Sequence, residues 1–187
     1  MLSIEAILKT IYHLSKEEVK QLYPYLEQVT FVRKEIILEE GATDYYLYFI
    51  QKGIVRSYIV REGKESTVYF AIENQVALSS PYLTEQSKAS FTLEASEDVI
   101  LWRVSRSNLQ ELLTSSVALS NWGIAITERF FAFSCFYLSH ICWMSKREQY
   151  HFIVKNAPEL IQRVPLKDLA SWLDITPQSL SIIRSLL

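Results

Sequence analysis

Residues 166–184, LKDLASWLDITPQSLSIIR, carry closely spaced hydroxyl, amide and guanidinium side chains beside helix-forming apolar residues. Thr176 followed by Pro177 is a strong start signal for a helix, because Thr caps the first turn and Pro fits its first position. The polar side chains that follow can bond base edges or phosphates of DNA. The candidate DNA-contacting residues are Thr176, Gln178, Ser179, Ser181, Ile182 and Arg184.

A shorter helix before this one would have to support it. Leu169, Ala170 and Leu173 form the apolar face of that first helix. A small side chain at Ala170 lets the second helix approach closely, and Leu180 and Ile183 point back toward it. This is the spacing of a helix-turn-helix, whose second helix enters the major groove.

The charge of this region gives little affinity for DNA. Residues 145–187 hold six Lys/Arg against four Asp/Glu, in a chain of formal net charge −2. Affinity for duplex DNA comes mainly from cations on phosphates, and the second helix carries only Arg184. The sequence also ends on this helix, so we expect no β-wing after it. A degenerate domain that no longer binds DNA is the alternative.

A long helix is predicted over 117–144, with apolar residues on nearly every face. A helix that is apolar all round is covered on more than one side, which suggests a sheet on one side and a partner subunit on the other. The alternative is the central core helix of a monomer. The candidate dimer-interface residues are Trp122, Ile126, Phe130, Phe133 and Tyr137.

Residues 29–105 have the composition of β-strands. Gly41, Gly53 and Gly63 punctuate runs of β-branched and aromatic residues, and Glu62-Gly63 predicts a hairpin. We expect about eight short antiparallel strands, arranged as a β-roll of jelly-roll type. The predicted fold class is therefore α+β: a β-roll with flanking helices, a long dimerisation helix and a small C-terminal helix-turn-helix domain without a wing.

Together these features resemble the Crp/Fnr family of bacterial transcription regulators. VTFVRKEIILEEGATDYYLYFIQKGIVRSYIV, residues 29–60, is similar to the family's opening β-roll, and residues 164–184 are similar to its helix-turn-helix pattern. The resemblance implies a cyclic-nucleotide-binding-like sensor domain at 1–116, a dimerisation helix at 117–144 and a DNA-binding-type domain at 145–187. It also implies a homodimer, double-stranded DNA as a weakly bound partner, and a small effector that the sequence does not identify.

The departures from the family pattern concern both sites. The turn glycine of the helix-turn-helix is Asp174 here, a residue that tolerates an unusual backbone better than most. An arginine of the second helix is replaced by Ile182. Weak binding to DNA is the consequence that we expect.

The nucleotide pocket departs further. In cyclic-AMP-binding members an arginine neutralises the phosphate and a glutamate bonds the ribose; these positions fall at Ala89 and Ser79. Ser79 and Ser80 could still cap a short helix and hold an anion, and Ser90 matches the family's serine. The candidate ligand-binding residues are thus Ser79, Ser80 and Ser90. We expect no tight binding of cyclic AMP, and an empty structural β-roll is the alternative.

Other function classes have little support. A cupin-like enzyme needs a cluster of His and Glu around a metal, but His13, His140 and His151 lie in helical segments outside the strands. No glycine-rich phosphate loop, nucleophile elbow or Cys-x-x-Cys motif is present. We predict a protein that is not an enzyme and needs no metal or cofactor.

The cellular location follows from the apolar segments and the cysteines. The longest apolar stretch, 130–144, is shorter than the roughly 20 residues that span a bilayer. Cys135 and Cys142 are too far apart on one helix to form a disulfide, which favours a reducing compartment. We predict a cytoplasmic protein with no membrane partner.

Overall fold

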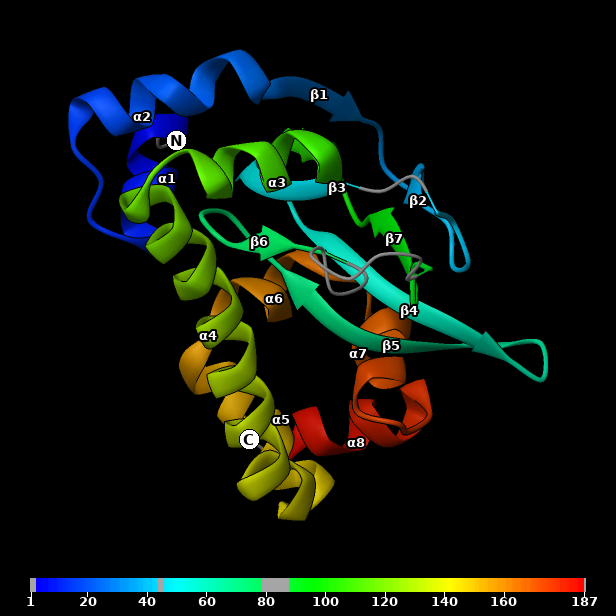
Figure 1. Cartoon of the computed structure of the whole chain (residues 1–187). Helices are drawn as coiled ribbons and strands as arrows, with labels where there is room; N and C mark the ends of the chain where they lie inside the picture. The colour runs from blue at the N-terminus through cyan, green and yellow to red at the C-terminus, as the bar shows by residue number, and fades with distance from the viewer. Residues whose placement is uncertain (1–2, 44–45, 79–87, 187) are drawn as a thin grey trace. The chain divides into compact units, whose positions relative to one another are not determined.

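The computed structural model describes residues 3–43, 46–78 and 88–186 of the chain. Within these residues two short helices precede the strands and a helical half follows them (Figure 1). The first part comprises α1 (Ile4–Ile11), α2 (Lys16–Leu22), the 3-10 turn η1 (Tyr23–Tyr25), β1 (Glu27–Phe31), β2 (Ile36–Leu38), β3 (Tyr46–Lys52), β4 (Val55–Arg61), β5 (Lys64–Ala71), β6 (Val76–Ala77), β7 (Thr92–Ala95) and β8 (Val99–Ser105). The second part comprises α3 (Arg106–Ser115), α4 (Val117–Ser139), the 3-10 turn η2 (Ile141–Trp143), α5 (Lys146–Asn156), α6 (Pro158–Arg163), α7 (Leu166–Trp172) and α8 (Pro177–Ser185).

The strands form two four-stranded sheets, in the orders β1-β8-β3-β6 and β2-β7-β4-β5. The pairs β1–β8, β3–β8, β3–β6 and β2–β7 are antiparallel. Glu62 and Gly63, which join β4 to β5, have φ angles of 52° and 75°, as a tight hairpin turn requires. The predicted α+β fold with an antiparallel β-roll and a long helix is confirmed.

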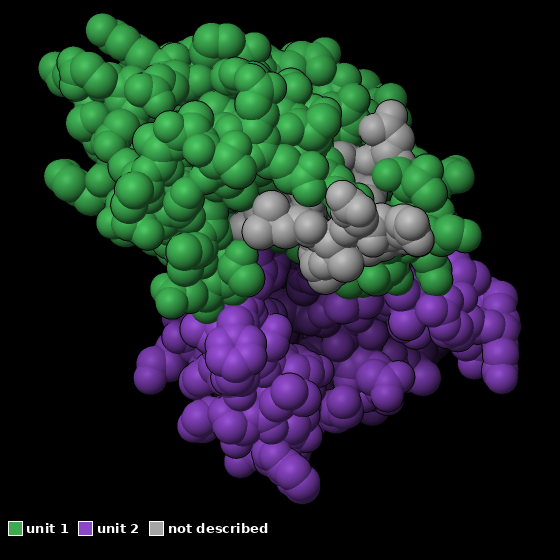
Figure 2. All heavy atoms as spheres, in the orientation of Figure 1, with its two compact units in different colours: residues 1–57, 70–129 green, residues 58–69, 130–187 purple. Residues whose placement is uncertain are grey.

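The structure divides into two compact units (Figure 2). One contains residues 1–57 and 70–129, and the other contains residues 58–69 and 130–187. The boundary falls inside α4 and inside both strands of the β4–β5 hairpin. The outer half of this hairpin therefore belongs to the same unit as α5–α8.

The first half of α4 packs into the core of the first unit. Trp122 is 1% exposed, its Nε1 donates to the carbonyl of Leu8 at 3.3 Å, and its ring lies 5.7 Å from that of Phe49. Helix α3 also approaches closely, since a Cβ on Gly123 would lie 2.5 Å from a methyl of Leu113. Three segments far apart in the sequence thus fix the direction of α4.

Two helix boundaries differ from the prediction. The predicted helix 117–144 ends at Ser139, where His140 leaves the helical backbone at φ −127° and a 3-10 turn follows. The pattern of residues 145–160 predicts one helix with Pro158 near its end, but α5 ends at Asn156 and Pro158 begins α6. Proline lacks an N–H and disfavours a helical residue before it, and Ala157 accordingly has φ −147° and ψ 58°.

Serine caps fix several helix starts. Ser15 lies three residues before Glu18, a spacing that predicts a capping box, and this box is present at α2. Ser145 and Glu148 form a second one at α5. Hydrogen bonds from the Ser145 side chain and then its backbone hold the pKa of Glu148 below its ordinary value. The stabilisation is therefore present above the carboxyl's unfolded pKa and is lost as the pH falls.

The turn between α7 and α8 has the predicted geometry. Asp174 adopts a left-handed backbone with φ 53°. Its N–H donates to the Ser171 carbonyl at 3.1 Å, and the N–H of Ile175 donates to the Ala170 carbonyl at 3.0 Å, which is the Schellman pattern. The Thr176 side chain then accepts from the Ser179 N–H and caps α8.

The backbone of this turn gives a test of stability. Replacing Asp174 with Gly should raise the free energy of unfolding by about 0.5–1 kcal/mol, because Gly has no Cβ to strain a left-handed residue. Asp174→Val should lower it by about 1–2 kcal/mol. Chemical denaturation of the full chain, followed by circular dichroism, measures both. A Gly variant less stable than wild type would show that the Asp174 side chain makes a favourable contact.

Candidate functional site

Helix α8 presents a polar face to solvent. Gln178, Ser181 and Ile182 are exposed, with Ile182 62% exposed, whereas Leu180 is fully buried. At about 100° per residue these three side chains share one side of the helix, opposite Leu180. The spacing of Ile182 from Leu180 and Ile183 predicts that Ile182 faces away from α7, and its exposure confirms this.

The other predicted contact residues lie at the margins of this face. Thr176 and Ser179 occupy the first turn of α8 and contact each other, with hydroxyl oxygens 3.0 Å apart. Arg184 is exposed near the end of the helix. Their hydroxyl, N–H and guanidinium groups are suited to phosphates.

A second cation lies near the end of α8. Arg147 is exposed near the start of α5, and its Nη2 donates to the carbonyl of Leu186 at 3.4 Å. The sequence does not predict a role for Arg147, because this residue lies 39 positions from Leu186 and no local pattern links the two. The described tail therefore places at least two guanidinium groups around α8.

The predicted dimer face of α4 is wrong at two positions. Trp122 and Ile126 are each 1% exposed, because they pack inside their own protomer and have no surface left for a partner. Phe130 is half-buried, while Phe133 and Tyr137 are 53% and 39% exposed. The face chosen from the sequence is thus a core face in the first half of the helix.

The opposite face of α4 carries an exposed apolar stripe of Val117, Ile124, Phe131 and Leu138. Their exposed fractions are 77%, 54%, 70% and 64%. They are spaced by seven residues, so they line one side of the helix as the residues of a coiled-coil seam do. The spacing was visible in the sequence, but only burial distinguishes this side from the core side.

A groove runs beside this stripe in the first unit. It has a volume of about 660 Å³. Its walls come from α3 and α4, and Ile124 of the stripe forms part of them. The lining residues are Gln110, Leu113, Thr114, Ser120, Gly123, Ile124, Thr127 and Glu128.

The predicted nucleotide pocket is described only in part. Ser79 and Ser80 lie outside the described residues, and Ser90 is exposed. Ala89 is 3% exposed; its N–H donates to the carbonyl of Ala42, and its carbonyl accepts from Gly41, both at 2.8 Å. A buried methyl group thus stands where the resemblance places a phosphate-binding arginine.

A charged cluster lies elsewhere in the β-roll. The Glu94 carboxylate is 2.9 Å from Nζ of Lys34 and 3.7 Å from Nη1 of Arg56. Arg56 is 1% exposed and Glu94 7%, so their opposite charges compensate each other away from water. The sequence analysis missed this cluster, since its members come from different segments of the roll.

The described part of the chain has neither a metal-ligand cluster nor a membrane-spanning helix. No group of three or more His, Cys, Asp or Glu there could hold a metal ion. None of the helices described is long and apolar enough to cross a membrane.

Comparison with known proteins agrees with this geometry. Residues 28–116 match the cyclic nucleotide-binding domain family. No curated protein sequence matches the chain.

Several solved structures share the fold. FixK2 from Bradyrhizobium japonicum is 19% identical with a TM-score of 0.71, over 87% of this chain and 84% of its own. A Crp/Fnr-family transcriptional regulator from Eubacterium rectale is also 19% identical, with a TM-score of 0.69 over 91% of this chain and 82% of its own.

The β-roll also resembles a kinase regulatory domain. The cAMP-bound regulatory domain of Toxoplasma gondii PKA is 16% identical with a TM-score of 0.53, over 58% of this chain. The match spans only 42% of that longer protein. Residues 28–116 thus match the cyclic nucleotide-binding domain family, and the fold of the chain is similar to that of Crp/Fnr-type regulators.

Proposed function

We propose that this chain is a dimeric, DNA-binding transcriptional regulator of the Crp/Fnr type, whose β-roll does not bind cyclic AMP tightly. The observation that carries the proposal is the α7–turn–α8 geometry, with Leu180 buried and an opposite face of Gln178, Ser181 and Ile182 exposed. A helix held in this way can enter a major groove with its polar side toward the bases. The alternative is a dimeric ligand-sensing or interaction protein that has lost DNA binding.

The charges around α8 support weak rather than tight binding. Each phosphate neutralised contributes about 0.9 units to the salt slope on duplex DNA. Arg184 and Arg147 are cations described at this helix, and the uncharged Ile182 occupies part of its exposed side. Base contacts from Gln178 and Ser181 would then have to supply much of any specificity.

The proposed homodimer uses the exposed stripe of α4. Val117, Ile124, Phe131 and Leu138 repeat at the seven-residue interval that a second parallel copy of the same helix matches. A two-fold arrangement also suits DNA recognition, because paired recognition helices bind half-sites one helical turn apart. Phe133 and Tyr137, which the sequence predicts as interface residues, are also exposed but lie on the other side of the helix.

At the position where the resemblance places a phosphate-binding arginine, the β-roll has no cationic side chain. A buried Ala89 offers no charge-assisted hydrogen bond, which contributes about 1.5–3 kcal/mol where present. We therefore propose that any effector of this β-roll is a small molecule other than cyclic AMP. Ser79, Ser80 and Ser90 would bind it through their hydroxyl groups.

The DNA proposal is tested by Ile182→Arg. One added cation per protomer should tighten binding to duplex DNA and steepen the salt slope by about two units per dimer. Thermal stability should stay unchanged, because Ile182 is 62% exposed. Binding is measured at low and moderate salt, on the DNA upstream of the chain's own gene and on a scrambled duplex.

Val32→Arg is the matched control, since Val32 is 65% exposed and lies on the β-roll. It adds the same charge away from α8 and should leave the salt slope as in wild type. If neither wild type nor Ile182→Arg binds either duplex at low salt, the tail is not a DNA-binding domain and the alternative holds. Nanomolar, sequence-specific binding by wild type at physiological salt would contradict the weak-binding proposal.

The dimer is tested by Phe131→Glu. A carboxylate at the seam would face its copy in the partner and lose its water on association, which costs several kcal/mol. Light scattering at micromolar concentration should show a dimer for wild type and a folded monomer for the variant. Val32→Glu is the matched control and should stay dimeric. A monomeric wild type, or dissociation by Phe133→Glu but not by Phe131→Glu, would overturn the stripe as the seam.

Calorimetry tests the effector proposal. Cyclic AMP should bind at least about 30-fold more weakly than to a pocket that holds the arginine, which corresponds to about 2 kcal/mol. A low-micromolar dissociation constant for wild type would contradict it.

A further inference from the structure

The groove between α3 and α4 lies beside a close approach of the two helices. Ser116 alone separates α3 from α4 and has an extended backbone, at φ −157° and ψ 155°. Because Gly123 has no Cβ, Leu113 of α3 can lie directly against the backbone of α4. The groove has a volume of about 660 Å³, which is within the range of about 300–1,000 Å³ typical of small-molecule sites.

The walls of this groove offer apolar surface to a ligand. Leu113 and Ile124 are the large apolar residues of its lining, and Ile124 is 54% exposed. Covering such surface with an aliphatic chain removes it from water and is favourable. The body of a matching ligand is therefore apolar.

The hydroxyl groups of the lining can accept hydrogen bonds but cannot readily donate them. Thr114, Ser120 and Thr127 each donate the hydroxyl hydrogen to a nearby backbone carbonyl, at 2.9, 3.1 and 3.2 Å. A hydroxyl has a single hydrogen, so only the lone pairs of these oxygens remain for a ligand. Among the described lining residues, an anionic ligand would find a side-chain donor only at Gln110.

The charge in the described lining is negative. Glu128 is its charged residue and is exposed. It follows Ile124 by four positions, so the carboxylate lies one turn along the same side of α4. The next residue, Arg129, donates to the carbonyl of Thr10, so its guanidinium group is held at α1. A ligand that matches the groove thus carries hydrogen-bond donors and a positive charge.

We propose that the α3–α4 groove binds a primary amine with an aliphatic chain. The chain covers Leu113 and Ile124, and the ammonium group contacts the Glu128 carboxylate. An ammonium group has three donors and no acceptor, which suits a lining made of acceptors. The site includes no residue of α8 or of the predicted nucleotide pocket, so the proposal does not rest on binding of DNA or of cyclic nucleotides.

Isothermal titration calorimetry of the full chain at pH 7 tests the site with n-octylamine, 1-octanol and octanoate. The three probes share one alkyl chain and differ in charge, because an alkylamine is protonated at this pH, as a lysine of pKa about 10.4 is, and a carboxylic acid is ionised. Octylammonium should bind about three- to tenfold more tightly than octanol, since it adds a charge-assisted contact. Octanoate should bind more weakly than octanol.

Glu128→Gln removes the charge and keeps the size of the side chain. The affinity for octylammonium should fall to that for octanol, while the affinity for octanol stays as in wild type. Glu17→Gln is the matched control, because Glu17 is an exposed carboxylate of the same unit outside the groove, and it should keep the preference for octylammonium. Thr114→Arg places a cation in the lining and should reverse the preference in favour of octanoate.

Ile124 also belongs to the exposed stripe, so the titrations are repeated on Phe131→Gln, which weakens the proposed seam without adding a charge. Preference for octylammonium in wild type or in Phe131→Gln supports the site. Absence of binding in both proteins would overturn it, as would equal affinity for the three probes. The same loss in Glu17→Gln as in Glu128→Gln would show attraction to the overall charge and would also overturn the site.

Discussion

The burial of Trp122 in its own protomer is the constraint on which the rest of the structure depends. Its indole contacts α1 through the Leu8 carbonyl and β3 through Phe49, so helix, sheet and N-terminal segment meet at one side chain. Side chains of a helix have fixed directions relative to one another, so the inward direction of Trp122 also determines which residues of α4 face outward. The exposed stripe on the other side of α4 follows from that single placement.

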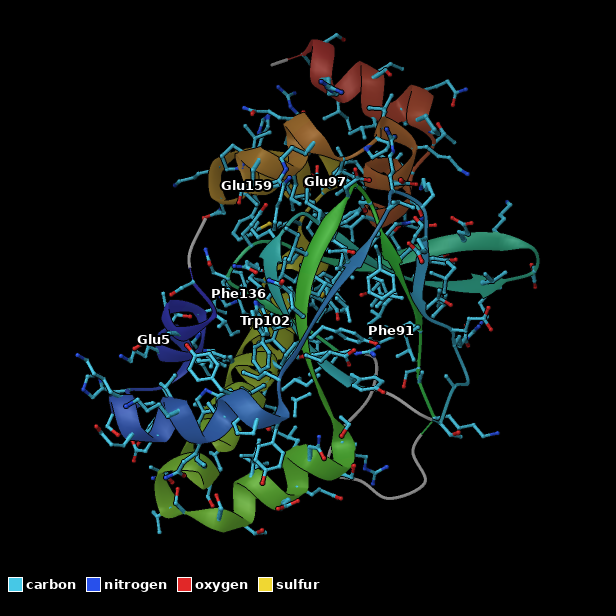
Figure 3. The ribbon with its side chains drawn as sticks, turned by 90° about the horizontal axis from the view of Figure 1, so that it is seen from above. Glu5, Phe91, Glu97, Trp102, Phe136 and Glu159 are labelled. Carbon is cyan, nitrogen blue, oxygen red and sulfur yellow. The ribbon has the colours of Figure 1, made fainter. Side chains whose placement is uncertain are left out.

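The same rotation sets the environment of the second half of α4. Beyond Arg129 the helix leaves the first unit, and the side that held Trp122 continues as Phe130, Phe133 and Tyr137. Phe136, labelled in Figure 3, instead lies 5.7 Å from Phe152 of α5 and stacks on His140. Aromatic residues around this half of α4 thus contact different neighbours, which explains why its sequence is apolar on every side.

In the tail, geometry and charge point to different strengths of binding. The Schellman turn, the Thr176 cap and the buried Leu180 produce a well-formed pair of helices, but α8 exposes an isoleucine where a cation would provide phosphate affinity. Packing requires only apolar contacts and a tolerable turn, whereas binding to DNA requires surplus positive charge. A fold of this type can therefore persist when affinity is low, and the proposed function accommodates both features.

Elements with local signals can be predicted from the sequence. Capping residues, the Glu62-Gly63 turn, the order of strands and helices, Asp174 in a left-handed turn and the outward direction of Ile182 all depend on neighbours within a few positions. Pro158 was recognised but placed within a helix, although its missing N–H makes it a helix start. Other features emerge only from long-range packing: the side of α4 that forms the core, Arg147 beside α8, Glu94 with Lys34 and Arg56, and Ser171 hydrogen-bonded to β5. Each of these joins residues far apart in the chain, and a helix that is apolar all round carries no periodic signal to show which side the core will occupy.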